Sequence, residues 1–187
     1  KNDIKNNLEK LFSNEIQLDK PITVESKSGE LINLGDRIKV TALVRSVDID
    51  NLTEEDIKEQ EIEMGELFFD GKKTMTSITV GLKITPTDEA AVQKLIQSGV
   101  PTDLIEVDNP NSSISLAFAT RQIVTDGDKI FVGHESIFVG KEARKFGIAS
   151  AVNARNESIY AQIGADSIFT MAASSDLDQQ GATHWAR

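Results

Sequence analysis

Cysteine is absent from the 187 residues of this chain, which excludes disulfides, thiolate metal sites and cysteine nucleophiles. Histidine, the usual base beside a catalytic serine, occurs only as His134 and His184, and no G-x-S-x-G turn accompanies them. No apolar run approaches the roughly 20 residues that cross a bilayer, and the first residues lack an apolar signal segment. We therefore expect a soluble protein whose compartment is open, with a virus particle among the options.

Aromatic residues are also scarce, at 5% of the chain against 39% hydrophobic residues, so the core must be mainly aliphatic. A chain of this length can bury one substantial core. We expect a single β-rich domain over residues 21–171, with a helical arm at residues 1–20 before it and an extended, irregular tail at residues 172–187 after it.

Alternation of apolar and polar residues predicts several strands. Residues 37–47 and 74–85 alternate most clearly, and in a third run Ile114, Leu116 and Phe118 are expected to share the buried face. An Asp-Gly pair at positions 126 and 127 is typical of a tight hairpin turn. Further strands are expected at 22–24, 137–139, 158–163 and 167–171. The pattern predicts a mainly β, α+β fold with an antiparallel sheet, either a sandwich or a barrel.

Two helices are expected beside the sheet. Residues 2–13 place Leu8 and Phe12 on one apolar stripe, which predicts a short amphipathic helix. A second helix is expected at residues 86–98, with Thr85 as its cap, proline at its first position and a glycine beyond its end. We expect this second helix to pack across the sheet.

The net charge of −10 is concentrated in one segment. Residues 48–70 hold ten acids against one base, whereas the other 20 acids and 19 bases nearly balance. We interpret this segment as an acidic insertion in the domain. Asp48, Asp50 and Glu59 have the spacing of an EF-hand loop, but Leu52 stands where a ligand is needed. We therefore predict no metal site; loose binding of a divalent cation and a solvated acidic surface stay open.

Signatures of cofactor-binding loops fail on spacing. Gly133 and Gly140 enclose six residues where a phosphate-binding loop needs four, and Glu142 stands where a serine or threonine would hold magnesium. The glycine-rich dinucleotide signature is likewise missing from the sequence. We predict no cofactor.

The appendages of the expected sheet favour contact with other proteins. Acidic and basic patches can set orientation across an interface, and a terminal tryptophan can anchor an arm on a neighbour. We therefore predict a non-enzymatic structural protein: a self-assembling or capsid-associated, phage-like subunit that forms a homo-oligomer or larger assembly. Neither a membrane nor nucleic acid is an expected partner. The residues expected to make these contacts are Trp185, His184, Arg144, Lys145, Glu54, Glu55, Glu59, Leu8 and Phe12.

Two alternatives fit parts of the same pattern. The strand at residues 37–47 could begin an OB-like barrel that binds single-stranded nucleic acid, or the acidic segment could mimic DNA. A hydrolase that uses carboxylates of the acidic segment is the third hypothesis. Few and scattered basic residues weigh against the first alternative, and the shortage of aromatic sugar platforms weighs against the third.

Overall fold

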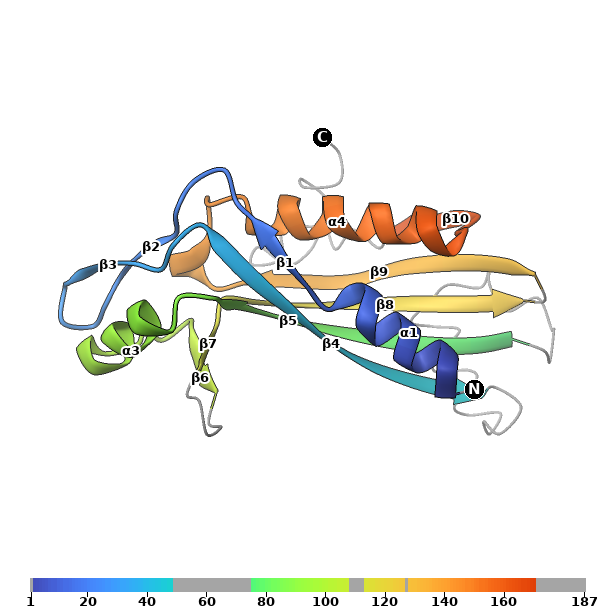
Figure 1. Ribbon diagram of the computed structural model, residues 1–187, viewed down its shortest axis with the longest axis horizontal. Helices are drawn as coiled ribbons and strands as arrows, with labels where there is room; N and C mark the ends of the chain where they lie inside the picture. The colour runs from blue at the N-terminus through green and yellow to red at the C-terminus, as the bar shows by residue number, and fades with distance from the viewer. Residues whose placement is uncertain (1, 49–74, 108–112, 127, 171–187) are drawn as a thin grey trace, which may run out of the picture.

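A six-stranded sheet forms the body of the computed structural model, which describes residues 2–48, 75–107, 113–126 and 128–170 (Figure 1). All neighbouring strands are antiparallel except the parallel pair at one edge. The strand order is β1 (Asn14–Gln17), β4 (Arg37–Asp48), β5 (Met75–Pro86), β8 (Ala117–Asp126), β9 (Lys129–Val139) and β10 (Ser167–Thr170), of which β9 and β10 form the parallel pair.

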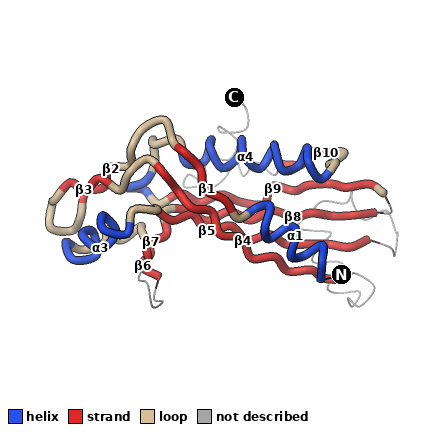
Figure 2. Tube along the Cα trace, viewed as in Figure 1, coloured by secondary structure: helices blue, strands red, loops and turns tan. Residues whose placement is uncertain are grey.

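Within the described residues, two short hairpins and three α-helices accompany the sheet (Figure 2). The hairpins are β2 (Thr23–Glu25) with β3 (Leu31–Asn33), and β6 (Ile105–Val107) with β7 (Ser113–Ser115). The helices are α1 (Asn2–Phe12), α3 (Glu89–Ser98) and α4 (Ile148–Ile163), and a single 3-10 turn, η3 (Lys141–Ala143), precedes α4. Within the described residues, no helix is long and apolar enough to cross a membrane.

Helices α1 and α4 cover one face of the sheet, and the core lies between them and the strands. The strands supply mostly aliphatic side chains, such as Ile38, Val80 and Ile84, each at most 2% exposed. The rings of Phe12 on α1 and Tyr160 on α4 lie 6.2 Å apart, so the two helices also contact each other. On the other face, Leu43, Phe118 and Phe138 are exposed by 54%, 38% and 48%.

The α+β class is confirmed, and so are the strands expected at 37–47 and 74–85 and the helix expected at 2–13. The expected sandwich or barrel is not confirmed. In the described part of the chain the sheet is open, because β1 and β10 lie at its two ends and do not pair with each other.

The strand expected at residues 158–163 is wrong, since these residues form the last turns of α4. The buried positions of α4 follow a helical period, but two of them are the polar residues Asn153 and Asn156. A search for regularly spaced apolar residues therefore misses the buried face of α4. The separate strand expected at 137–139 is part of the continuous strand β9.

The expectation that Phe118 shares the buried face with Ile114 and Leu116 is wrong. The chain passes from β7 into β8 at Leu116, whose N–H binds the carbonyl of Ile84 on β5. This break shifts the alternation by one residue, so Ala117 and Ala119 are buried and Phe118 is exposed.

The second expected helix begins later than the sequence indicated. Strand β5 continues to Pro86, and Asp88 caps α3 by accepting a hydrogen bond from the N–H of Ala91 at 3.0 Å. Gly99, with φ of 95°, ends the helix as expected. Instead of crossing the sheet, α3 packs beside the β2–β3 hairpin and β7.

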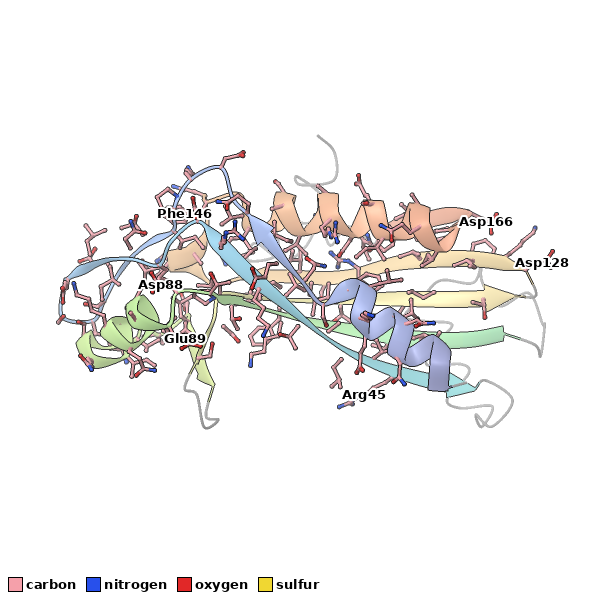
Figure 3. The ribbon with its side chains drawn as sticks, in the orientation of Figure 1. Arg45, Asp88, Glu89, Asp128, Phe146 and Asp166 are labelled. Carbon is pink, nitrogen blue, oxygen red and sulfur yellow. The ribbon has the colours of Figure 1, made fainter. Side chains whose placement is uncertain are left out.

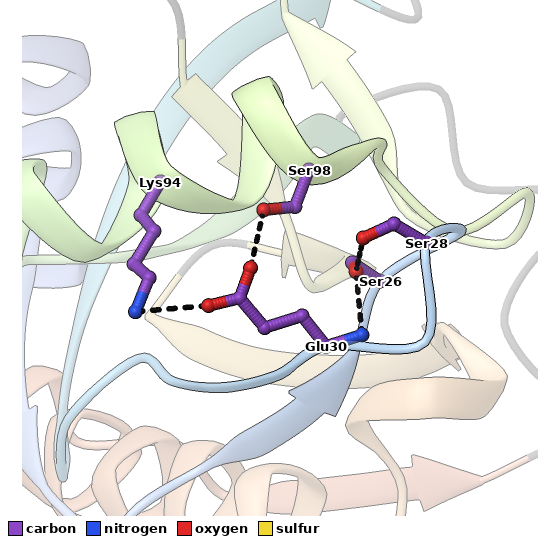
Figure 4. A network of polar contacts seen from close by, with 5 residues as sticks. All are labelled: Ser26, Ser28, Glu30, Lys94 and Ser98. Atoms are coloured by element: carbon purple, nitrogen blue, oxygen red, sulfur yellow. Dashed lines mark hydrogen bonds and ion pairs between the residues drawn. The ribbon is translucent and has the colours of Figure 1, made fainter.

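A polar network joins α3 to the β2–β3 hairpin (Figure 4). Glu30 accepts a hydrogen bond from Ser98 at 2.9 Å and pairs with Lys94 at 3.1 Å, while its backbone N–H donates to Ser26. The hydrogen bond from Lys94 is the main cause that lowers the pKa of Glu30, followed by that from Ser98. The contacts of Glu30 with Ser98 and Lys94 are solvent-exposed and link the hairpin to the helix.

Candidate functional site

Helix α4 connects the two parallel strands, so β9, α4 and β10 form a β-α-β unit. In such units, ligands bind beyond the carboxyl ends of the strands, where the connecting helix begins. Residues 140–147 join the end of β9 to the first residue of α4, and we call this segment the β9–α4 loop. Figure 3 labels Phe146 of this loop at one end of the sheet, far from Asp128 and Asp166 at the other.

Two residues of the β9–α4 loop have left-handed backbone conformations: Lys145 with φ of 71° and Gly147 with φ of 78°. Such a conformation is unfavourable for lysine, and strained residues of this kind cluster at functional sites. The loop is anchored to its surroundings, because Nε of Arg144 donates to the carbonyl of Val139 at 3.0 Å. In addition, Nζ of Lys20 lies 5.5 Å from the ring centre of Phe146.

The beginning of α4 offers unpaired backbone donors to a ligand. The first N–H groups of any helix have no partner inside the helix. Here the N-cap is Gly147, which makes no side-chain cap, and the first turn contains no acidic residue. Three basic side chains, Lys141, Arg144 and Lys145, precede the helix against one acid, Glu142. Backbone donors, the positive end of the helix dipole and these charges together suit a phosphate group.

Strand β9 has an open edge next to this loop. It pairs with β10 only from Phe131 to His134, so among the described residues no strand pairs with positions 135–139 on that side. Within this stretch the carbonyl of Ser136 accepts a hydrogen bond from Arg121 and that of Val139 accepts one from Arg144. The same stretch begins at a β-bulge, because the β8–β9 register shifts between Thr120 and Arg121. Bulges occur often next to active sites, where they redirect a strand.

A polar cluster lies buried beneath α4. Arg121 is 0% exposed, and its Nη2 donates to Oδ1 of Asn153 at 2.8 Å. Beside it, Nε2 of His134 lies 2.8 Å from the hydroxyl of Tyr160. Burial, with a further contribution from the charge of Arg121, lowers the pKa of His134 to about 4. Burial raises the pKa of Tyr160 to about 12, although the charge of Arg121 opposes that shift.

These side chains are unsuited to direct contact with a substrate. At neutral pH both His134 and Tyr160 are uncharged, and each is at most 5% exposed. Burial also lowers the pKa of Arg121, but a guanidinium remains protonated in this range. The cluster therefore acts on its surroundings through position and charge.

Two shallow cavities border the β-α-β unit. One of about 470 Å³ lies between β1 and α4 and is lined by Ala151, Ala154, Arg155 and four other residues. Another, of about 270 Å³, lies beside η3 and is lined mainly by polar residues, including Glu25, Lys27 and Glu142. No group of three or more histidine or acidic side chains in the described segments could hold a metal ion.

The residues that the sequence singled out are only partly brought together. Arg144 and Lys145 lie in the β9–α4 loop, whereas Leu8 and Phe12 of α1 are buried in the core at 6% and 0% exposure. Apart from Asp48 at the end of β4, the acidic insertion and the tail, including the residues Glu54, Glu55, Glu59, His184 and Trp185, lie outside the described residues. The expected homo-oligomer or larger assembly stays a prediction.

Sequence reasoning missed Gly147 and Arg121. Gly147 could have been found as the glycine directly before a helix. It was missed because the sequence analysis did not predict α4. Arg121 has the same parity in β8 as the buried residues Ala119 and Ile123, which could have indicated that it points into the core.

Comparison with known proteins gives structural matches only. No family model and no curated protein matches the chain. The chain is similar to an aminoglycoside N-acetyltransferase, AAC(6')-Iy, solved in complex with CoA, at 15% identity over 77% of this chain and 88% of that one, with a TM-score of 0.33. A putative acetyl transferase from Pyrococcus furiosus matches at 17% identity over 77% and 89%, with a TM-score of 0.36. An aminoglycoside acetyltransferase from an uncultured soil metagenomic sample matches at 16% identity over 78% and 89%, with a TM-score of 0.30.

These matches contradict the predicted function. We expected a non-enzymatic, capsid-associated subunit, but each of the three matched structures is described as an acetyltransferase. The OB-like barrel is also at odds with the open sheet and its parallel edge. At these identities and TM-scores the likeness does not assign an activity to this chain, so function has to be argued from the site.

Proposed function

We propose that this chain is an acyltransferase that binds a coenzyme A thioester at the β9–α4 loop. One observation carries the proposal: a basic loop leads to an uncapped helix start directly beside an open stretch of strand edge. The first feature suits a phosphate, and the second suits a ligand that can pair with extended backbone.

Coenzyme A has both matching parts. Its pyrophosphate would meet the backbone donors at the start of α4 and the charges of Arg144 and Lys145. Its pantetheine arm carries two amides, which can exchange hydrogen bonds with the edge of β9 at positions 135–139, where no described strand pairs. The carbonyls of Ser136 and Val139 are already acceptors for Arg121 and Arg144, so the other backbone groups of this edge would meet the arm. A nucleoside diphosphate has the pyrophosphate but lacks the amide arm, so it would use only the first feature.

The chemistry would be transfer of the acyl group from the thioester sulfur to an acceptor such as an amine. A bond forms between the amine nitrogen and the carbonyl carbon, the carbon–sulfur bond breaks, and the proton lost by the amine ends on the released thiol. The chain has no cysteine, so no acyl group can rest on a protein thiol. Direct transfer within a complex of donor and acceptor is the simplest route.

Calorimetric titration of the full chain with coenzyme A, ADP and pyrophosphate tests the cofactor. We expect coenzyme A to bind more tightly than ADP. We also expect ADP to compete with coenzyme A, which would show that both bind at the same site. The double variant Arg144→Ala with Lys145→Ala should weaken coenzyme A binding at least tenfold, since two charge-assisted contacts are removed. Arg155→Ala is the matched control: Arg155 is an exposed arginine within the body of α4, and its loss should leave binding unchanged.

An activity assay then tests the reaction class. Acetyl coenzyme A is mixed with a panel of amines, and the released thiol is measured with a thiol reagent, to which the cysteine-free chain adds no background. Thiol release that requires both enzyme and amine supports acyl transfer. If the wild-type chain binds neither coenzyme A nor acetyl coenzyme A, the proposed function is wrong.

A further inference from the structure

Arg121 is a buried charge without a carboxylate partner. Its side chain is 0% exposed, and among the described residues no acidic side chain forms an ion pair with it. Its Nη1 donates to the carbonyls of Thr120 at 3.0 Å and Ser136 at 2.9 Å, and its Nε has no hydrogen-bond partner. Burying an arginine against neutral acceptors alone is costly for stability, so its place in the core calls for a reason.

The contacts of Arg121 fix this charge at one point between three segments. Thr120 lies on β8, Ser136 lies on β9 directly after the bulge, and Asn153 lies on α4. All three acceptors are neutral, so they hold the guanidinium in place without cancelling its charge. The cation is thus set under α4, beside the open stretch of β9.

The position of Asn153 gives the distance to the start of the helix. It is five residues beyond Ile148, which corresponds to about 8 Å along the helix axis. At about 10 Å and an effective dielectric constant of about 20, a single positive charge strengthens the binding of a single negative charge roughly tenfold. Salt screens such a buried charge less than it screens the exposed lysines of the loop.

We propose that Arg121 is the internal counter-charge for the anionic group of the ligand at the start of α4. It does not touch the ligand; it acts through the potential that it creates beneath the helix. This inference rests on the proposed function, because it assigns a role to Arg121 in holding the pyrophosphate. It adds a residue from β8 to a site otherwise built from the β9–α4 loop.

Replacing Asn153 separates the charge of Arg121 from its packing. Asn153→Asp keeps the shape and puts a carboxylate 2.8 Å from Nη2, which neutralises the cation without removing it. We expect the affinity for coenzyme A and for pyrophosphate to fall about tenfold, while the thermal midpoint stays the same or rises. Asn153→Ala is the control: it removes the hydrogen bond from Arg121 and lowers the midpoint, but it keeps the charge of Arg121, so affinity should stay within about threefold of wild type.

The outcomes separate this inference from the proposed function. If wild type binds coenzyme A and folded Asn153→Asp binds it equally well, Arg121 is not the counter-charge and only this inference fails. If wild type binds neither coenzyme A nor pyrophosphate, both fail. Should Asn153→Asp not fold, as judged by circular dichroism, the pair Arg121→Lys and Arg121→Met decides: retained affinity in the lysine variant and a loss in the methionine variant supports the inference, and equal affinities overturn it.

Discussion

The Nε2 atom of His134 on β9 and the hydroxyl of Tyr160 on α4 lie 2.8 Å apart in the interior, where both side chains are almost fully buried. The two rings, with centres 5.5 Å apart, also pack against each other. This pair joins the strand that ends at the β9–α4 loop to the helix that begins there. Both groups titrate, so the contact between β9 and α4 can be tested at acidic pH through His134 and at alkaline pH through Tyr160.

Lowering the pH should destabilise the fold through His134. In the unfolded chain the imidazole takes up a proton near 6.5, whereas in the folded chain burial keeps it neutral down to about 4. The unfolded state therefore binds more protons between these values, and stability falls as the pH falls through this window. The loss amounts to about 3 kcal/mol in the free energy of unfolding, measurable by urea titrations at several pH values.

A non-titrating variant isolates that contribution. His134→Gln retains a polar group near the hydroxyl of Tyr160 but cannot gain a proton in this range. The stability difference between wild type and variant should shrink as the pH is lowered from 6.5 toward 4. A difference that stays constant would mean that His134 is not the responsible group.

Raising the pH should reveal Tyr160, which is the only tyrosine of the chain. Burial raises the pKa of its hydroxyl from 10.0 to about 12, so stability is intact below pH 10 and is lost as the pH rises toward 12. We expect the ultraviolet absorbance of tyrosinate to remain absent past pH 10 in the native protein. In denaturant the same group should titrate near 10, and a native titration at that value, with circular dichroism unchanged, would contradict the burial.

The periodicity of apolar residues predicts the individual strands and helices whose apolar residues are regularly spaced. Strands β4 and β5 alternate over most of their length, and α1 carries an apolar stripe, so their residues alone indicate them. The parallel pairing of β9 with β10 depends instead on contacts across α4, and no pattern within either strand encodes it. For the same reason the open shape of the sheet could not be told from a sandwich or barrel.

The sequence analysis missed those residues of the candidate site whose position or conformation depends on contacts with distant parts of the chain. Arg144 and Lys145 stood out by charge alone, but nothing in the residue type of Lys145 indicates its left-handed conformation. The burial of Arg121 depends on Asn153, which lies 32 residues later in the chain. A buried asparagine on α4 both receives the arginine and conceals the helix from a reading of apolar residues.

Gly140, where the β9–α4 loop begins, should not tolerate a side chain. A Cβ atom there would lie 2.5 Å from Cδ2 of Leu104 and 2.7 Å from the carbonyl oxygen of Asp103, and a backbone carbonyl cannot easily move aside. We expect Gly140→Ala to lower the free energy of unfolding by roughly 1–3 kcal/mol in urea titrations. Gly81→Ala on β5 is the control, because its nearest contact would be an ordinary 3.8 Å, and its stability should change little. Equal losses in both variants would contradict this steric cause.

Alanine variants of Gly147 and Gly164 can distinguish the effect of backbone strain on stability from an effect on ligand binding, because the two glycines lie at opposite ends of the same helix. They flank α4 at its two ends with φ of 78° and 74°, and a Cβ atom at either would meet nothing within 4 Å. Alanine at each position should therefore cost a similar amount, about 1 kcal/mol, for the left-handed backbone alone. Thermal unfolding should thus show two equally destabilised variants.

Only one of the two should bind coenzyme A less well. We expect alanine at position 147 to favour another loop conformation and to turn the first N–H groups of α4 away from the proposed phosphate position, whereas Gly164 lies at the opposite end of the helix. We expect Gly147→Ala to weaken binding about tenfold in calorimetric titration and Gly164→Ala to match wild type. If both variants lose affinity equally, the effect follows general destabilisation of α4, and the start of the helix is not where the ligand is held.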